Sequence, residues 1–245
     1  MCTAKWHISL LAARFTLLLS TSSIILVLPT ILAANDPTEF DPKQWALLLA
    51  QGDFRSAAAE SDHAIAFYRG VIAADPEKGQ YYLVGFYMCA KAQLAALLGD
   101  FVGADRILSE AKAYSLGHPG FSGFLNPWDV IVSETHAFIL EKAGKRDEAA
   151  QAYDIRYPYY GQSRLALLAL DAGDYTKARQ LALIVETLPT ALFVLGRLEE
   201  KDGHKQAARE RYNSAWVELH RIGISEPIFY CDGPAIANAQ KRLER

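Results

Sequence analysis

Five short fragments of the chain share a glycine that is followed, five residues later, by an alanine. Glycine ends a helix readily, because a residue without a Cβ adopts the left-handed conformation at little steric cost. An aspartate follows three of these glycines, and its side chain can cap the next helix. The pattern therefore predicts helix–turn–helix hairpins. The glycines are Gly52, Gly99, Gly144, Gly173 and Gly203, and the alanines are Ala57, Ala104, Ala149, Ala178 and Ala208.

Further residues recur at fixed distances from these glycines. Small residues seven positions before and twelve positions after a glycine would let the two helices of a hairpin pack closely. A bulky residue nine positions after the glycine would fill the space between neighbouring hairpins. The small residues before the turn are Ala92, Ala137, Ala166 and Gly196, with Trp45 as the exception. Those after it are Ala64, Ala111 and Ala215, with Arg156 and Val185 as exceptions, and the bulky residues are Leu108, Tyr153 and Tyr212.

The segments between the turns favour helix throughout. Residues 81–99, 134–144 and 164–173 are rich in alanine and leucine and contain no proline. No segment alternates apolar and polar residues over more than four positions, as a half-buried strand would. The sequence therefore predicts an all-α fold.

This pattern resembles the tetratricopeptide repeat, a helix–turn–helix unit of about 34 residues. The resemblance covers residues 40–220 and includes an aromatic residue two positions after the glycine, at Phe54, Phe101 and Tyr175. The glycines are 47, 45, 29 and 30 residues apart, so the units would be degenerate. The resemblance implies a right-handed α-solenoid of about five hairpins, with residues 235–245 as a C-terminal capping helix. A generic helical bundle is the alternative.

The first 34 residues differ from the rest of the chain. Lys5, His7 and Arg14 precede an apolar stretch at residues 15–34, which ends in the small residues Ala33 and Ala34. This order is typical of a secretory signal peptide. The alternative is a retained anchor in the inner membrane, because about 20 apolar residues span a bilayer. Both interpretations predict that residues 35–245 form a periplasmic or secreted solenoid domain.

Charge and cysteine content limit the partners. Without residues 1–34 the chain has 23 lysines and arginines against 28 acidic residues, a net charge of −5. This balance argues against nucleic acid as a partner, and against membrane contact beyond the N-terminal segment. Cys89 and Cys231 would remain after processing, and they either form a disulfide or stay as two buried thiols.

In proteins of the resembling family, the first helices of successive units line a groove that holds a peptide or a partner helix. Counting back from each glycine by helical periods gives the corresponding face here. This face is aromatic and slightly acidic, which favours an apolar or basic segment of a partner protein. The aromatic residues would alternatively belong to the core. The predicted groove residues are Phe86, Gln93, Ile131, Glu134, Phe138, Glu141, Tyr160, Phe193, Arg197 and Glu200.

Two segments rich in aromatic residues, 115–129 and 156–162, would either dock a partner or pack against the side of the array.

The sequence contains no motif for catalysis or metal binding: no metal-ligand spacing, nucleophile motif or phosphate loop occurs. We therefore expect no metal, no cofactor and no enzymatic activity. The expected function is a non-catalytic scaffold or adaptor in a cell-envelope process, with self-association as a further possibility. The alternative is an all-α enzyme or small-ligand binder that uses Asp129, Glu134, Glu141 or His136.

Overall fold

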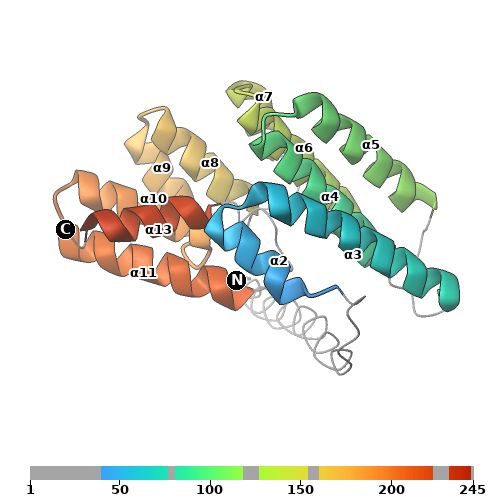
Figure 1. Ribbon diagram of the computed structural model, residues 1–245. Coiled ribbons are helices and arrows are strands. Elements are labelled where there is room, and N and C mark those ends of the chain that lie inside the picture. The colour runs from blue at the N-terminus through green and yellow to red at the C-terminus, as the bar shows by residue number, and fades with distance from the viewer. Residues whose placement is uncertain (1–39, 77–80, 118–126, 154–159, 223–231, 244–245) are drawn as a thin grey trace, which may run out of the picture. The chain divides into compact units, whose positions relative to one another are not determined.

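The computed structural model describes residues 40–76, 81–117, 127–153, 160–222 and 232–243. The chain divides into two units, residues 1–39 and 40–245, and every described residue belongs to the second. The regular structure of these residues is entirely helical, which confirms the predicted all-α class (Figure 1). The helices are α2 (Pro42–Gln51), α3 (Phe54–Ala74), α4 (Tyr81–Leu97), α5 (Phe101–Gly117), α6 (Pro127–Lys142), α7 (Arg146–Tyr153), α8 (Tyr160–Asp171), α9 (Tyr175–Ile184), α10 (Pro189–Lys201), α11 (Lys205–Ile222) and α13 (Gly233–Leu243).

The left-handed conformation predicted at the five turn glycines is confirmed. Their φ angles lie between 78° and 84°, and no other described residue has a positive φ. At each turn the residue after the glycine donates its N–H to the carbonyl five positions back, as Asp53 does to Leu48 at 3.0 Å. These bonds satisfy carbonyls that the helix end would otherwise leave unpaired.

The predicted aspartate caps are also confirmed. The Asp53 side chain accepts from the N–H of Ser56 at 3.1 Å, and the Asp174 side chain accepts from Lys177 at 3.0 Å. The Asp100 side chain accepts from the N–H of Gly103 in the same way, at 2.9 Å. Each cap pairs an otherwise unsatisfied N–H and places a negative charge at the positive end of the following helix.

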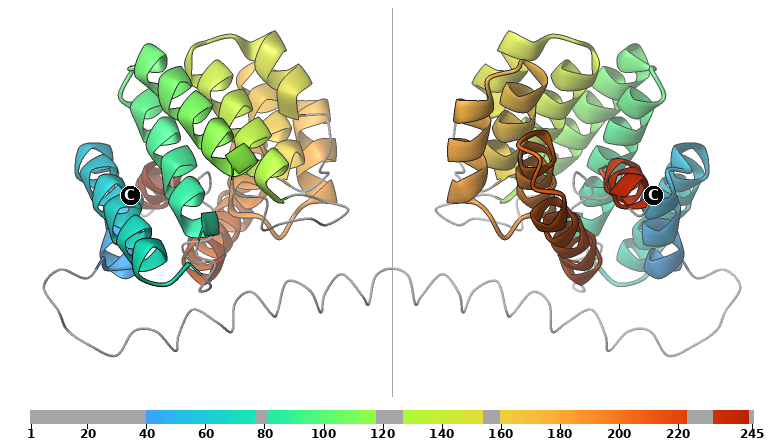
Figure 2. Two further views of the ribbon diagram at one scale, coloured as in Figure 1. Left: turned by 90° about the vertical axis from the view of Figure 1, so that its right-hand side faces the viewer. Right: turned by 90° about the vertical axis from the view of Figure 1, so that its left-hand side faces the viewer.

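The turns join the helices into the pairs α2–α3, α4–α5, α6–α7, α8–α9 and α10–α11, and each pair packs against the next. The helix predicted at residues 235–245 is present as α13. It packs against α11 and also against α2, at the other end of the described chain (Figures 1 and 2). Its N-terminus approaches α2 closely, because a Cβ on Gly233 would lie 3.2 Å from the backbone of Ala50.

The small residues flanking the turns are buried, as the pattern predicts. A Cβ on Gly196 would lie 2.5 Å from the ring of Tyr212, so only glycine lets α10 approach α11 at this point. Val185 is also buried, whereas Arg156 lies outside the described residues. The alanines at the repeat positions are all fully buried: Ala57, Ala64, Ala92, Ala104, Ala111, Ala137, Ala149, Ala166, Ala178, Ala208 and Ala215.

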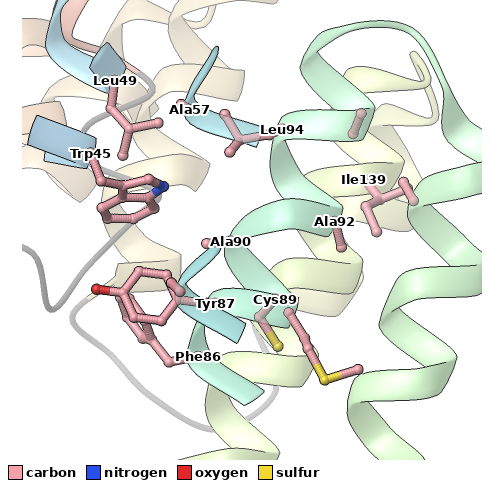
Figure 3. Close-up of a cluster of buried hydrophobic side chains, with 14 of the residues drawn as sticks. Trp45, Leu49, Ala57, Phe86, Tyr87, Cys89, Ala90, Ala92, Leu94 and Ile139 are labelled. Carbon is pink, nitrogen blue, oxygen red and sulfur yellow. The ribbon is translucent and has the colours of Figure 1, made fainter. Parts of the chain in front are cut away.

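The largest core cluster contains residues from both ends of the described chain. The rings of Trp45 and Tyr87 meet edge to face with centroids 5.2 Å apart (Figure 3). The indole N–H of Trp45 donates to Ser61 Oγ at 2.9 Å, so its polar atom is satisfied inside the core. Tyr212 of α11 and Ile236 of α13 belong to the same cluster. Searched over the described residues alone, no helix is long and apolar enough to cross a bilayer.

We predict that Gly173→Ala lowers the free energy of unfolding by about 1–2 kcal/mol, because the alanine must hold a left-handed conformation. No atom lies within 4 Å of a Cβ built there, so backbone strain alone is tested. Gly70→Ala is the matched control. Gly70 lies inside α3, also with nothing within 4 Å, and its replacement raises stability by about 0.5–1 kcal/mol. Urea denaturation measures both, and equal effects would contradict the turn assignment.

Candidate functional site

The three phenylalanines predicted to line a groove are buried in the structure. The exposed fraction is 3% for Phe86, 0% for Phe138 and 5% for Phe193, so they offer little surface to a partner. Phe86 packs against Trp45, and the guanidinium of Arg164 lies 5.3 Å from the ring centroid of Phe138. In the described structure these side chains serve the core.

The other residues predicted for the groove lie in several places. Gln93 is buried, and its amide nitrogen donates to Thr135 Oγ1 at 3.1 Å. Arg197 is exposed and Glu200 half-buried, and these two come together in one surface hollow. The remaining three, Ile131, Glu134 and Tyr160, are half-buried, and Glu141 belongs to an internal ion cluster.

The residues of the alternative, chemical hypothesis do not gather into a metal site. Asp129 and His136 are exposed on α6, and no group of histidines, cysteines and acids among the described residues could hold a metal ion.

Cys89 is buried in the structure. Burial raises the pKa of its thiol to about 12, although a hydrogen bond with Thr135 acts in the opposite direction. Cys231 and most of the two aromatic junctions lie outside the described residues, so their roles stay predictions.

The most deeply buried charge in the described structure is Arg164 of α8, whose side chain is 0% exposed. Its Nη1 donates to both carboxylate oxygens of Asp232, at 2.8 Å each. Its Nε donates to Glu141 of α6 at 3.1 Å, and its Nη2 donates to the same carboxylate. Thr190 of α10 donates its hydroxyl to Asp232, and Tyr153 of α7 donates to Glu141 at 3.0 Å. This ion cluster joins four helices to the residue that precedes α13.

Three groups of this cluster have strongly shifted pKa values, and each keeps one protonation state near neutral pH. Burial would lower the pKa of Arg164, but Asp232 and Glu141 hold it well above its usual value. Burial would likewise raise the pKa of Glu141, but Arg164 and Lys142 lower it to about 2. Burial and the adjacent Glu141 raise the pKa of Tyr153 well above its usual value. A side chain whose pKa lies this far from neutral pH does not exchange its proton there. These groups are therefore unsuited to general acid–base chemistry at neutral pH.

A surface hollow of about 500 Å³ lies where the ends of α8, α9, α10 and α13 come together. Three cations line it, together with one carboxylate and two largely apolar side chains. Its walls are formed by Leu170, Tyr175, Arg197, Glu200, Lys201 and Arg242.

The lone carboxylate of the hollow is already engaged. Arg242 of α13 donates to both oxygens of Glu200, at 2.9 and 2.7 Å, and Tyr212 donates its hydroxyl at 2.7 Å. The hydrogen bond from Arg242 is the largest of the influences that lower the pKa of Glu200. Arg242 is thereby held in the wall by its pairing with Glu200.

The other two cations of the hollow contact aromatic rings. Lys201 Nζ lies 4.2 Å from the ring centroid of Tyr175, and the Arg197 guanidinium lies 5.9 Å from that of Phe193. Neither makes an ion pair within the described part of the chain. Contact with an aromatic face orients a cation without neutralising its charge. Arg197 and Lys201 therefore present positive charge to solvent, and Arg197 also lies close enough to Glu200 to lower the pKa of that carboxylate.

No protein-family model matches the chain, and no curated protein matches it in sequence. A solved structure, the crystal structure of BtubC (BKLC) from P. vanneervenii, is similar with a TM-score of 0.45 and 14% identity over 78% of this chain and 87% of that chain. A likeness this low carries no argument about function.

We predict that the stability of the protein falls as the pH drops from about 5 to 2. The folded-state pKa of Glu141 is lowered from 4.5 to about 2, so its contribution is present above the ordinary pKa and is lost as the pH falls through the folded value. The shift corresponds to about 3 kcal/mol. Glu141→Gln reduces this loss of stability in acid and destabilises the protein near neutral pH by about 3 kcal/mol or more.

Glu110→Gln is the control for this experiment, because Glu110 is exposed and pairs only with Arg106 one turn away. Its effect stays within about 0.5 kcal/mol at every pH. Chemical denaturation over the pH series measures all three proteins. A loss of stability in acid that is unchanged in Glu141→Gln would show that the ion cluster does not stabilise the fold.

Proposed function

We propose that residues 35–245 form a degenerate tetratricopeptide-like α-solenoid that acts as a non-catalytic scaffold or adaptor for another protein. The basic and apolar segment at residues 1–34 would direct it to the periplasm or the exterior, or anchor it in the inner membrane. The five pairs of helices, each with a left-handed glycine at its turn and each packed on the next, support the repeat architecture.

The observation that carries the binding role is the hollow with two cations, Arg197 and Lys201, that form no ion pair in the described structure. Helix ends from four separate elements converge there, and rigid elements present binding groups more reproducibly than isolated loops do. The groups of the ion cluster with strongly shifted pKa values, by contrast, form their hydrogen bonds with one another in the interior. The arrangement therefore supports recognition at the surface over chemistry in the interior.

The hollow also changes where a partner is expected to dock. The sequence favoured a groove containing Phe86, Phe138 and Phe193, and these side chains are buried. Arg197 and Glu200, from the same predicted set, line the hollow instead. We place the docking site at these two residues and their neighbours Tyr175 and Lys201.

We predict that a photo-crosslinking amino acid in place of Tyr175 captures one recurrent protein in intact cell envelopes. Tyr175 is 43% exposed in the wall of the hollow, so a docked partner lies within reach of the probe. The same amino acid at Val102, which is exposed on α5 and outside the hollow, is the control. Identical crosslinking from the two positions, or no protein from either, would refute the scaffold role. Recovery of the chain only from the cytoplasmic fraction would refute export.

A further inference from the structure

We infer that the hollow binds an acidic segment of the partner protein, in which a carboxylate side chain stands next to an apolar one. This inference rests on the proposed function and adds the chemistry of the partner. It reverses the preference for an apolar or basic segment that the sequence pattern favoured.

The charge of the hollow carries the inference. Three cations and one carboxylate line it, so its walls hold a net charge of +2, although the chain from residue 35 onward has a net charge of −5. Glu200 accepts hydrogen bonds from Arg242 and Tyr212, which leaves it little capacity to attract a basic ligand. A positive hollow in an acidic protein attracts carboxylates selectively and repels basic segments.

The neighbouring acids do not neutralise the hollow either. Glu199 of α10 and Asp202, the residue after α10, pair with Arg179 of α9 at 2.9 and 2.7 Å. Glu199 also contacts His204 at 2.9 Å. These two carboxylates are thus already paired outside the walls of the hollow, and neither forms an ion pair with Arg197 or Lys201.

The apolar part of the wall indicates a peptide over a free anion. Leu170 and Tyr175 line the same hollow as the cations; Leu170 is only 8% exposed, so the half-exposed ring of Tyr175 supplies the accessible apolar surface. Lys201 packs over the Tyr175 ring, so apolar surface and positive charge are adjacent. An inorganic anion would use only the charge, whereas an acidic segment with a leucine or phenylalanine beside its carboxylate would use both. A volume of about 500 Å³ is sufficient for a few side chains.

The test measures binding of a fluorescent peptide of alternating glutamate and leucine by anisotropy, with the full chain. The comparison peptides replace every glutamate by glutamine or by lysine. We expect the acidic peptide to bind at least tenfold more tightly than either, with affinity that falls as salt is raised. Equal affinity for the glutamine peptide would overturn the inference.

Arg197→Glu combined with Lys201→Glu locates the binding site. Both residues are exposed and lack ion-pair partners within the described structure, so the fold is retained, as circular dichroism would verify. We expect at least a tenfold loss of affinity for the acidic peptide. The control is Arg106→Glu with Lys145→Glu, two exposed residues outside the hollow with the same change of net charge, which should lose less than threefold. An equal loss in the two double variants would show only a general charge effect and would overturn the inference.

Inorganic phosphate distinguishes a peptide site from a simple anion site. Phosphate that displaces the peptide at equal or lower concentration than unlabelled peptide would overturn the inference in favour of a small anion. The outcome is separable from the proposed function. Crosslinking at Tyr175 without acidic-peptide binding would leave the scaffold role standing and refute only the acidic partner, whereas peptide binding without a crosslinked protein would refute the scaffold role.

Discussion

The arrangement of the helices depends on the pairing of the buried Arg164 guanidinium with two carboxylates, those of Glu141 and Asp232. A charge inside a protein is costly unless it is paired and its hydrogen bonds are satisfied. Arg164 meets this condition only when Glu141 of α6 and Asp232 before α13 are both in place. Removing either carboxylate leaves a cation in the interior without full compensation. The cluster therefore requires α6, α8 and the start of α13 to hold one relative position.

The position of α13 connects this internal cluster to the surface hollow. Asp232 is the residue immediately before α13, and Arg242 lies near the opposite end of that helix. Arg242 forms part of the wall of the hollow through its two hydrogen bonds to Glu200. The same helix also contacts α2 and α11, and its Ile236 lies in the largest core cluster. The internal ion cluster and the proposed docking site therefore lie at opposite ends of the same helix.

The local features of the fold could be predicted from the sequence, and the long-range ones could not. The left-handed turn at Gly173 and the cap by Asp174 depend on residues within one or two turns of helix, so a short fragment contains the information. The pairing of Arg164 with Asp232 spans 68 residues, and no periodicity links them. The sequence signal for a buried charge was a single arginine at the start of the apolar segment 164–170. That signal does not indicate which carboxylate pairs with the arginine. The groove prediction also required knowing which face of each helix is exposed. The face that carries Phe138 is turned to the core, so this residue was assigned wrongly.

Hydrogen exchange of α13 tests the central claim, that the buried pair of Arg164 and Asp232 holds this helix in place. The account predicts that amides of residues 233–243 exchange slowly in the wild type and at least tenfold faster in Asp232→Asn, while those of α4 change little. Asp105→Asn, at an exposed position of α5, should leave α13 protected. Protection of α13 that is the same in Asp232→Asn and in the wild type would contradict the account.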